Sequence, residues 1–439
     1  MKLDFSSLKL GEEQAEVYKL LEKTRDNYFI TGKAGTGKSV LLQYFVEHTK
    51  KQIAIVAPTG IAALNVGGQT IHSFFRLTTD VQDAKDHKKV TSNLDRIKSI
   101  LRRLDCLVID EISMVGADII DMIDAKMRFA RGTDQPFGGC QIVAFGDLYQ
   151  LPPITPKGDA LAFIRDRYQT IHFFNAEAIL KSPFKVVELT EVFRQTDPVF
   201  VDILNQIRLG EVTPDLIRTI NENCHVRPQD QQYITLASMN ATADSINRLR
   251  LSELNTSEFH FKCKVEGEMT AREYPAAETL GLKVGAQVMM TKNDHIDPEE
   301  GRLKQRWVNG SLGTISYLDK DEIRVTIDGH EYKVEKERWD KFRYHYNTET
   351  GLLEKEPVAG FIQYPIALAY AITIHKSQGQ TYDAVKVNLG RGAFATGQTY
   401  VAMSRCRSLE GLFFENPLRL SDIRVDPVVV SFMDRFRVE

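Results

Sequence analysis

The sequence of 439 residues predicts an α/β protein built on parallel β-sheets, and three observations support this fold class. Short apolar strands alternate with amphipathic helical segments in the first half of the chain, a pattern typical of helices that cover a parallel sheet. A glycine-rich turn at 32–39 joins one such strand to a helix. Between 253 and 358, strands that alternate apolar and polar residues indicate an inserted β region instead.

The first half of the chain supplies the strands of the expected parallel sheet. These strands cover residues 28–30, 53–57, 106–109, 140–145 and 184–189. A helix is expected from about Lys38, directly after the glycine-rich turn. A second helix is expected where apolar residues recur on one helical face, at Leu94, Ile97, Ile100, Leu101 and Leu104.

The inserted β region divides a second α/β domain. Asp328-Gly329 separates two alternating strands, and this pair favours a tight hairpin turn because both residues tolerate a positive φ. Further strands are expected at 288–290 and 313–317. The expected domains are 1–180 for the first α/β domain, 181–252 and 359–439 for the two parts of the second, and 253–358 for the inserted β domain.

Composition places the chain among ordinary globular proteins, with 43% hydrophobic and 26% charged residues. A net charge of −3 argues against simple electrostatic binding of nucleic acid, for which a strongly basic domain is expected. Five cysteines without paired spacing argue against a disulfide framework or a zinc site, so a cytoplasmic location is expected. The longest apolar run, near 365–374, is too short to span a membrane.

Residues 32–39, GKAGTGKS, match every fixed position of a P-loop and predict a site for ATP. The glycines let backbone N–H groups approach phosphates, and the following helix points its positive end at them. Lys38 can reach the β and γ phosphates, and the Ser39 hydroxyl can bind Mg²⁺. The residues expected to bind the nucleotide are Gly35, Thr36, Gly37, Lys38 and Ser39.

An apolar strand that ends in Asp110-Glu111 supplies the expected partner of the P-loop. Asp110 is expected to hold Mg²⁺, and Glu111 to act as general base toward the attacking water. Hydrolysis also needs cations near the γ phosphate, where charge develops. Two arginines are candidates for this role: Arg194 in EVFRQ and Arg405 in YVAMSR.

In this order the motifs resemble those of the RecD-like helicases of superfamily one, and most closely the PIF (petite integration frequency) family. The resemblance runs from Gln14 to about Leu412. It rests on the segments 57–63 (APTGIAA), 71–75 (IHSFF), 118–139, 146–153 (GDLYQLPP) and 371–379 (AITIHKSQG). The resemblance implies that Gln14 reads adenine, that Gln150 senses the γ phosphate, and that Arg405 is an arginine finger with Arg194 as the second phosphate arginine.

The resemblance also implies a fold and an activity. The fold would be two RecA-like P-loop domains with ATP between them and an SH3-like inserted β domain. The activity would be that of a DNA helicase of DNA repair and recombination, moving 5′ to 3′ on single-stranded DNA and at duplex junctions and working as a monomer. The chain resembles a minimal bacterial or phage-like member of the family.

The same resemblance indicates where DNA binds. The expected ligands are Pro58, Thr59, His72, Phe74, Phe75, His375, Ser377 and Gln378. One of Phe74 and Phe75 could stack on a base, or both rings could be core. Trp307 is an example of an inserted-domain residue that could handle the strand, although a core role is the simpler interpretation.

Three alternatives stay open at this point. The chain could be a RecD-type motor subunit of a recombination nuclease, an ATP-driven RNA remodeller, or a nucleotide-gated switch without translocation. The intact Glu111 and the two candidate arginines argue against a mere switch. DNA- and RNA-stimulated ATPase rates would discriminate among the rest.

Overall fold

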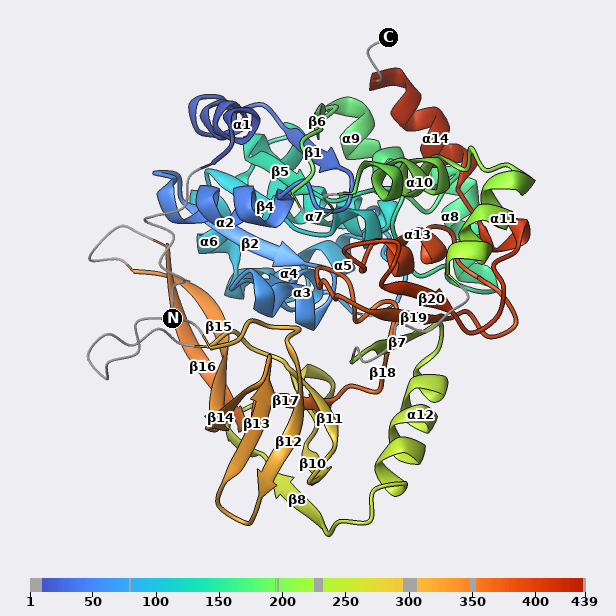
Figure 1. Cartoon of the computed structure of the whole chain (residues 1–439). Coiled ribbons are helices and arrows are strands. Elements are labelled where there is room, and N and C mark those ends of the chain that lie inside the picture. The colour runs from blue at the N-terminus through green and yellow to red at the C-terminus, as the bar shows by residue number, and fades with distance from the viewer. Residues whose placement is uncertain are drawn as a thin grey trace. The chain divides into compact units, whose positions relative to one another are not determined.

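The computed structural model describes residues 10–78, 80–193, 195, 197–224, 232–294, 306–347 and 353–436. The chain folds into two units, and each unit is assembled from separate stretches of sequence. Unit 1 comprises 1–193, 341–358 and 427–439, and unit 2 comprises 194–340 and 359–426. The colours of Figure 1 follow the chain through both units.

Unit 1 contains a six-stranded parallel sheet in the order β3-β2-β4-β5-β1-β6. Its strands are β1 (Tyr28–Gly32), β2 (Ile53–Ala57), β3 (Gln69–Thr70), β4 (Cys106–Ile109), β5 (Gln141–Phe145) and β6 (Lys185–Leu189). The five strands expected from the sequence are therefore confirmed. Since β6 pairs with β1 over its whole length, unit 1 continues to Phe193, beyond the boundary expected at residue 180.

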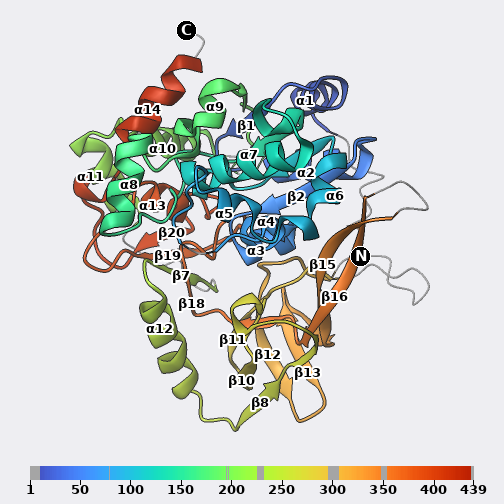
Figure 2. The same ribbon diagram turned by 180° about the vertical axis from the view of Figure 1, so that it is seen from behind.

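Helices cover both faces of this sheet. They are α1 (Glu12–Lys23), α2 (Lys38–His48), α3 (Gly60–Asn65), α4 (Ile71–Phe75), α5 (His87–Thr91), α6 (Lys98–Arg103), α7 (Ala117–Arg131), α8 (Asp159–Tyr168), α9 (Glu177–Lys181) and α14 (Pro427–Met433). On one face, Leu21 of α1 and Phe45 of α2 pack into a core with Ile30 and Val108 of the strands. The view from behind in Figure 2 shows α7 over the other face.

The helix expected across Leu94–Leu104 is wrong as a single element. A 3₁₀ turn at Leu94–Arg96 precedes α6, and Ile97 between them has φ −124° and ψ −5°, outside the helical region. All five apolar residues of the predicted face are nevertheless buried. The apolar spacing therefore identified the buried face but did not reveal the break in the backbone.

Unit 2 contains a smaller parallel sheet in the order β18-β7-β19-β20. Its strands are β7 (Ile234–Ala237), β18 (Ala371–Thr373), β19 (Val385–Asn388) and β20 (Leu412–Phe414). The helices of unit 2 are α10 (Pro198–Leu209), α11 (Pro214–Asn223), α12 (Asn240–Ser252) and α13 (Gln398–Met403). The expected second α/β domain is thus present, interrupted in sequence by the antiparallel strands.

The inserted antiparallel region lies between β7 and β18 in sequence. Its strands are β8 (Glu258–Lys262), β9 (Lys264–Gly267), β10 (Thr279–Lys283), β11 (Gln287–Met290), β12 (Leu312–Leu318), β13 (Ile323–Ile327), β14 (His330–Val334), β15 (Glu337–Tyr346), β16 (Leu353–Gln363) and β17 (Ile366–Leu368). The predicted hairpin is confirmed: β13 pairs with β14, and Asp328 and Gly329 take φ values of +48° and +78°.

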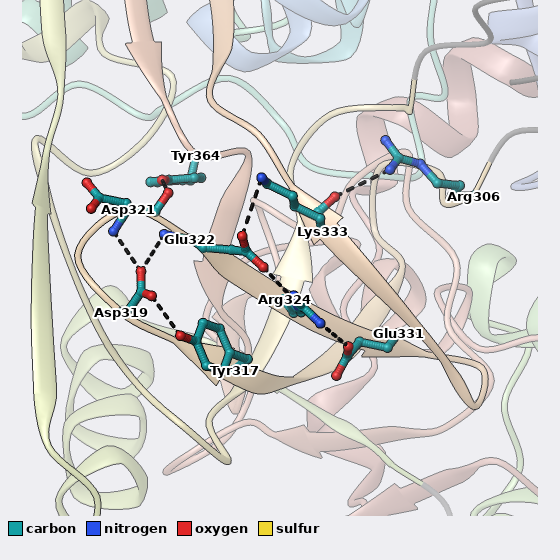
Figure 3. Close-up of polar contacts among 9 residues, drawn as sticks. All are labelled: Arg306, Tyr317, Asp319, Asp321, Glu322, Arg324, Glu331, Lys333 and Tyr364. Atoms are coloured by element: carbon teal, nitrogen blue, oxygen red, sulfur yellow. Dashed lines mark hydrogen bonds and ion pairs between the residues drawn. The ribbon is translucent and has the colours of Figure 1, made fainter. Parts of the chain in front are cut away.

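Alternation in β13 separates a buried side from a charged side. Ile323, Val325 and Ile327 point into the core of the region. Arg324 points the other way and pairs with Glu331 at 3.1 Å and with Glu322, while Lys333 reaches Glu322 at 3.4 Å (Figure 3). Exposed ion pairs of this kind contribute only about 0–1 kcal/mol each, so the apolar side stabilises the sheet.

Trp307 belongs to the core of the inserted region, so its core interpretation is confirmed and its use as an exposed strand-handling residue is wrong. Its ring is 6% exposed. The Arg306 guanidinium lies 4.3 Å from the ring centroid and pairs with the buried Asp294 through two nitrogens, at 2.9 and 2.6 Å. The large apolar area that an aromatic ring buries accounts for the place of Trp307 in this core.

The inserted region and the end of the chain do not follow the expected boundaries. Residues 341–358, the outer part of the β15–β16 hairpin, belong to unit 1, as do residues 427–439. On α14, Phe432 stacks on Phe174 with ring centroids 4.1 Å apart and planes 9° apart. Among the described residues, no helix has the length and apolar character needed to cross a membrane.

Candidate functional site

The glycine-rich turn takes a conformation that only glycine adopts without strain. Gly32 has φ +149°, and a Cβ there would lie 2.6 Å from the Leu189 carbonyl oxygen. Gly37 has φ +74° and directly precedes α2, whose first residue is Lys38. The amino end of this helix points its positive dipole end and its first N–H groups out of the helix, and is suited to a phosphate.

The Lys38 side chain folds back over the loop. Its Nζ donates to the carbonyl oxygens of Gly32 at 2.7 Å and of Lys33 at 3.0 Å. The hydroxyl of Thr36 also donates to the Lys33 carbonyl, at 3.0 Å. The ammonium therefore lies across the loop, in position to exchange these carbonyls for phosphate oxygens.

Two carboxylates stand at the end of β4, whose neighbour β5 separates it from β1 and the P-loop. Burial and the adjacent Glu111 carboxylate raise the pKa of Asp110 to about 8, against the opposing effects of the Glu111 N–H and Lys38. Glu111 itself has φ +49° and ψ +44°, a left-handed conformation unusual for a residue with a side chain. Such strain is typical of catalytic positions.

Gln150 follows β5, the strand between those that carry the P-loop and the carboxylates. Its side-chain amide donates to Asp147 Oδ2 at 3.2 Å, and its backbone N–H donates to the Asp147 carbonyl at 3.0 Å. Asp147 is 1% exposed and also accepts the Tyr149 N–H at 3.2 Å. Asp147 therefore fixes the orientation of Gln150, a role that the sequence pattern did not predict.

Gln14, for which the resemblance implies contact with adenine, lies against the P-loop. Its amide donates to the carbonyl oxygens of Thr36 and Gly37, both at 3.4 Å, and its oxygen accepts the Gly11 N–H at 3.2 Å. Phe193 stands beside it with 52% of its surface exposed, and its N–H donates to the Gly35 carbonyl at 2.8 Å. An exposed ring at this position was missed in the sequence, although EVFRQ contains it.

The two predicted arginines fall in the sequence ranges of unit 2. Arg194 lies outside the described residues. Arg405, in unit 2, is 1% exposed, and its guanidinium donates to the Val401 carbonyl at 3.0 Å and to Ser404 Oγ at 2.8 Å. The neighbouring Gln195 amide donates to the Ser404 and Cys406 carbonyls at 3.1 and 3.3 Å. Arg405 is thus held in a defined orientation within its own unit.

Of the predicted DNA ligands in unit 2, one is exposed and one is buried. His375 follows β18 and is exposed. Ser377 is fully buried, and its hydroxyl donates to the Ile374 carbonyl at 2.8 Å, so in this structure it supports the turn and offers no surface to DNA. Gln378 is half-buried in the same turn.

In unit 1, Phe74 and Phe75 are both core residues, so of the two alternatives expected from the sequence the core alternative holds and neither ring is presented to a base. Their exposed fractions are 2% and 0%, and the rings pack edge to face with centroids 4.9 Å apart. His72, on the same short helix, is half-buried, and this burial lowers its pKa. Thr59 is half-buried and its hydroxyl accepts the Ala62 N–H at 3.2 Å as a helix cap, directly after the half-buried Pro58.

A P-loop, two carboxylates and a glutamine at one edge of a parallel sheet define a P-loop nucleoside triphosphatase. Comparison with known proteins makes this class specific. The profile of the family described as PIF1-like helicase matches residues 9–215. The chain is 34% identical to the ATP-dependent DNA helicase Pif1 of Bdellovibrio bacteriovorus, over 98% of this chain and 92% of that protein.

Solved structures agree with this match. A crystal structure of Bacteroides sp Pif1 in complex with ADP-AlF4 has a TM-score of 0.88 at 35% identity, over 98% of this chain and 97% of that one. A crystal structure of Bacteroides Pif1 bound to ssDNA has a TM-score of 0.68 at 35% identity, with the same coverage. The chain belongs to the PIF1-like helicase family.

Proposed function

We propose that this chain is an ATP-dependent DNA helicase that translocates 5′ to 3′ on single-stranded DNA and unwinds duplex or structured DNA. Membership in the PIF1-like family gives the class of enzyme. The observation that carries the proposal is the assembly of Lys38, Glu111 and Gln150 at one edge of the unit 1 sheet. The direction of movement is inferred from the resemblance of the motifs.

Mg²⁺ fits the donor groups of this site. Asp110 ends β4 with a carboxylate whose pKa is raised to about 8, because its charge is buried next to that of Glu111. A divalent cation favours the charged form of such a carboxylate. We expect Asp110 and the Ser39 hydroxyl to hold the ion, which would supply charge neutralisation at the phosphates.

The remaining groups divide the chemistry of hydrolysis. Glu111 takes the proton of the attacking water, and Gln150, oriented by Asp147, contacts the γ phosphate or that water. Lys38 binds the β and γ phosphates. Arg405 and Arg194 supply positive charge from the second unit as the γ phosphate leaves.

Each unit offers exposed or half-buried groups for the DNA strand. Unit 1 offers Thr59 and His72, and unit 2 offers His375 at the carboxyl end of β18. Parallel strands end at a shared edge, and β19 lies two places from β18, with β7 between them. Phe394, in the segment after β19, is 58% exposed and is proposed as a base-stacking ring.

We also propose that the two parallel sheets belong to RecA-like domains and that the antiparallel region is an SH3-like insert. The P-loop position after β1 and the parallel order of both sheets support the first assignment. The five-stranded antiparallel sheet in the order β14-β13-β12-β11-β17 supports the second. Single-stranded DNA and duplex junctions are the proposed partners, and a monomer is the proposed working form.

Direction is tested with two duplexes that differ only in which strand carries a single-stranded tail. We expect ATP-driven unwinding of the duplex with a 5′ tail and little or none of the duplex with a 3′ tail. A trap for released strands makes the products of one binding event visible. Preference for the 3′ tail would contradict the direction. ATPase activity stimulated by RNA but not by DNA would favour an RNA remodeller instead.

Phe193→Ala is expected to raise the KM for ATP about tenfold with kcat nearly unchanged, because one ring–base stack contributes about 1–3 kcal/mol. The ring stands next to Gln14, and lies 3.6 Å from where a Cβ of Gly37 would be. Steady-state ATPase assays measure both constants. Inhibition by tripolyphosphate, which has no base, should stay unchanged. Phe129→Ala removes another exposed ring of unit 1 and is the control; an unchanged KM in Phe193→Ala would exclude the stacking role.

A further inference from the structure

The side chain of Tyr344, on β15, accepts a backbone hydrogen bond from β2 at a position where β3 does not pair with β2. Its side chain is 4% exposed, and its hydroxyl accepts a hydrogen bond from the Ile55 N–H at 3.0 Å. Ile55 lies on β2, but β3 pairs with β2 only at Val56 and Ala57. The Tyr344 hydroxyl therefore satisfies a buried backbone donor just before β3 begins.

Two further contacts hold the same hairpin against unit 1. The Phe342 carbonyl accepts a hydrogen bond from the Gln69 side-chain amide, at the start of β3. The Tyr344 ring meets Phe74 edge to face, with centroids 5.5 Å apart and planes at 89°. The hairpin thus touches β2, β3 and α4, three elements of unit 1.

These elements carry the proposed DNA ligands of unit 1. β2 runs directly into Pro58 and Thr59, and α4 contains His72 two residues before Phe74. The three contacts described above use the Ile55 N–H, the Gln69 amide and the Phe74 ring, and not Thr59 or His72. The hairpin therefore supports the backbone and the buried ring from which these ligands project.

The other end of the hairpin is anchored in the inserted β region. Residues 359–362 of β16 pair with 264–267 of β9, and Trp339 packs against Phe361 with centroids 6.0 Å apart. Strand β15 thus begins among residues of unit 2 and continues into unit 1, and β16 begins in unit 1 and ends in unit 2. The pairing of β15 with β16 makes this hairpin a continuous link between the inserted β strands and the elements of unit 1 that it contacts.

We propose that Tyr344 is a positioning residue through which the inserted β hairpin sets the affinity of unit 1 for single-stranded DNA. It acts through Ile55 and Phe74 on the segments that carry Thr59 and His72, and it does not touch DNA. This inference rests on the proposed function of these segments. It also assigns the inserted region a role in DNA binding that requires no exposed ligand of its own.

Tyr344→Phe isolates the hydroxyl, because the ring and its contact with Phe74 are kept while the acceptor for the Ile55 N–H is lost. We expect the concentration of a single-stranded oligonucleotide that half-activates ATP hydrolysis to rise about fivefold, within the range expected when a buried donor loses its partner. The kcat at saturating DNA and the KM for ATP should stay near the wild-type values. Fluorescence anisotropy with a labelled oligonucleotide should show the same loss of affinity.

The matched control is Tyr332→Phe on β14, the same chemical change in the part of the inserted region that belongs to unit 2. Gln69→Met removes the hydrogen bond between the Gln69 amide and the Phe342 carbonyl, and is expected to weaken DNA binding by about twofold. If Tyr344→Phe does not fold, Gln69→Met is the variant that tests the proposal. The proposal is overturned if folded Tyr344→Phe binds DNA with wild-type affinity. If Tyr344→Phe does not fold, wild-type affinity in Gln69→Met overturns it instead. A loss of kcat or of thermal stability without a loss of DNA affinity also overturns it. Absence of DNA stimulation in the wild-type protein would instead defeat the proposed function, and this inference with it.

Discussion

Lys38→Ala is expected to reduce ATP hydrolysis by at least about 10²–10³-fold, the range for removing one group that stabilises transition-state charge. The ammonium lies over the P-loop on the Gly32 and Lys33 carbonyls, 2.7 and 3.0 Å away, where the phosphates would replace them. Alanine leaves the backbone N–H groups of the loop in place. Weak nucleotide binding should therefore survive while turnover is lost.

The measurement is the rate of phosphate release at saturating single-stranded DNA, together with a thermal unfolding curve. Lys33→Ala is the matched control, because this lysine lies in the same loop at a position that the P-loop pattern leaves variable. It should retain most of the activity. Turnover near the wild-type rate in folded Lys38→Ala would contradict the assignment of this loop as the phosphate site.

Glu111→Gln is expected to lower kcat by about 10²–10⁴-fold while binding of ATP is kept, because an amide has the size of the carboxylate but cannot accept the proton. The left-handed backbone at Glu111, with φ +49°, directs this side chain independently of its charge. The substitution also removes the charge that helps to raise the pKa of Asp110. Ionisation of Asp110 should then become easier, and binding of the magnesium nucleotide should not weaken.

Single-turnover hydrolysis and equilibrium binding of a fluorescent ATP analogue separate the two effects. Asp110→Asn gives the contrast, since it removes the proposed ligand of the ion and should weaken binding of the magnesium nucleotide. If Glu111→Gln lost nucleotide affinity to the same extent as Asp110→Asn, Glu111 would be a principal ligand of the ion. Its role as general base would then be abandoned.

Local patterns predicted most of the secondary structure and the nucleotide site. The P-loop and the strand ending in Asp110 are each contiguous in sequence, and their chemistry depends on fixed spacing. The turn at Asp328-Gly329 was predictable for the same reason, because the two residues themselves favour the backbone they adopt. Periodicity likewise identified the apolar faces that form the core.

What the sequence did not reveal depends on contacts between distant residues. Phe74 and Phe75 read as candidate stacking rings, but Tyr344, about 270 residues away, covers Phe74 in the core. Trp307 is likewise buried, because it packs in a core formed by residues from several strands of the inserted region. Phe193, by contrast, stays exposed because it follows the last strand of its sheet. No single-sequence pattern distinguishes an exposed ring from a buried one when both lie in apolar segments.

The return of the chain to unit 1 at α14 has a consequence for synthesis. The sheet of unit 1 is complete at Leu189, but Phe432, which stacks on Phe174, follows roughly 240 residues later. At about 5–20 residues per second, the ribosome needs roughly 10–50 s to make that stretch. During this interval Phe174 lacks its stacking partner, and nascent unit 1 presents an apolar surface to chaperones. A fusion placed directly after residue 439 would prolong this exposure if it hindered α14 from docking.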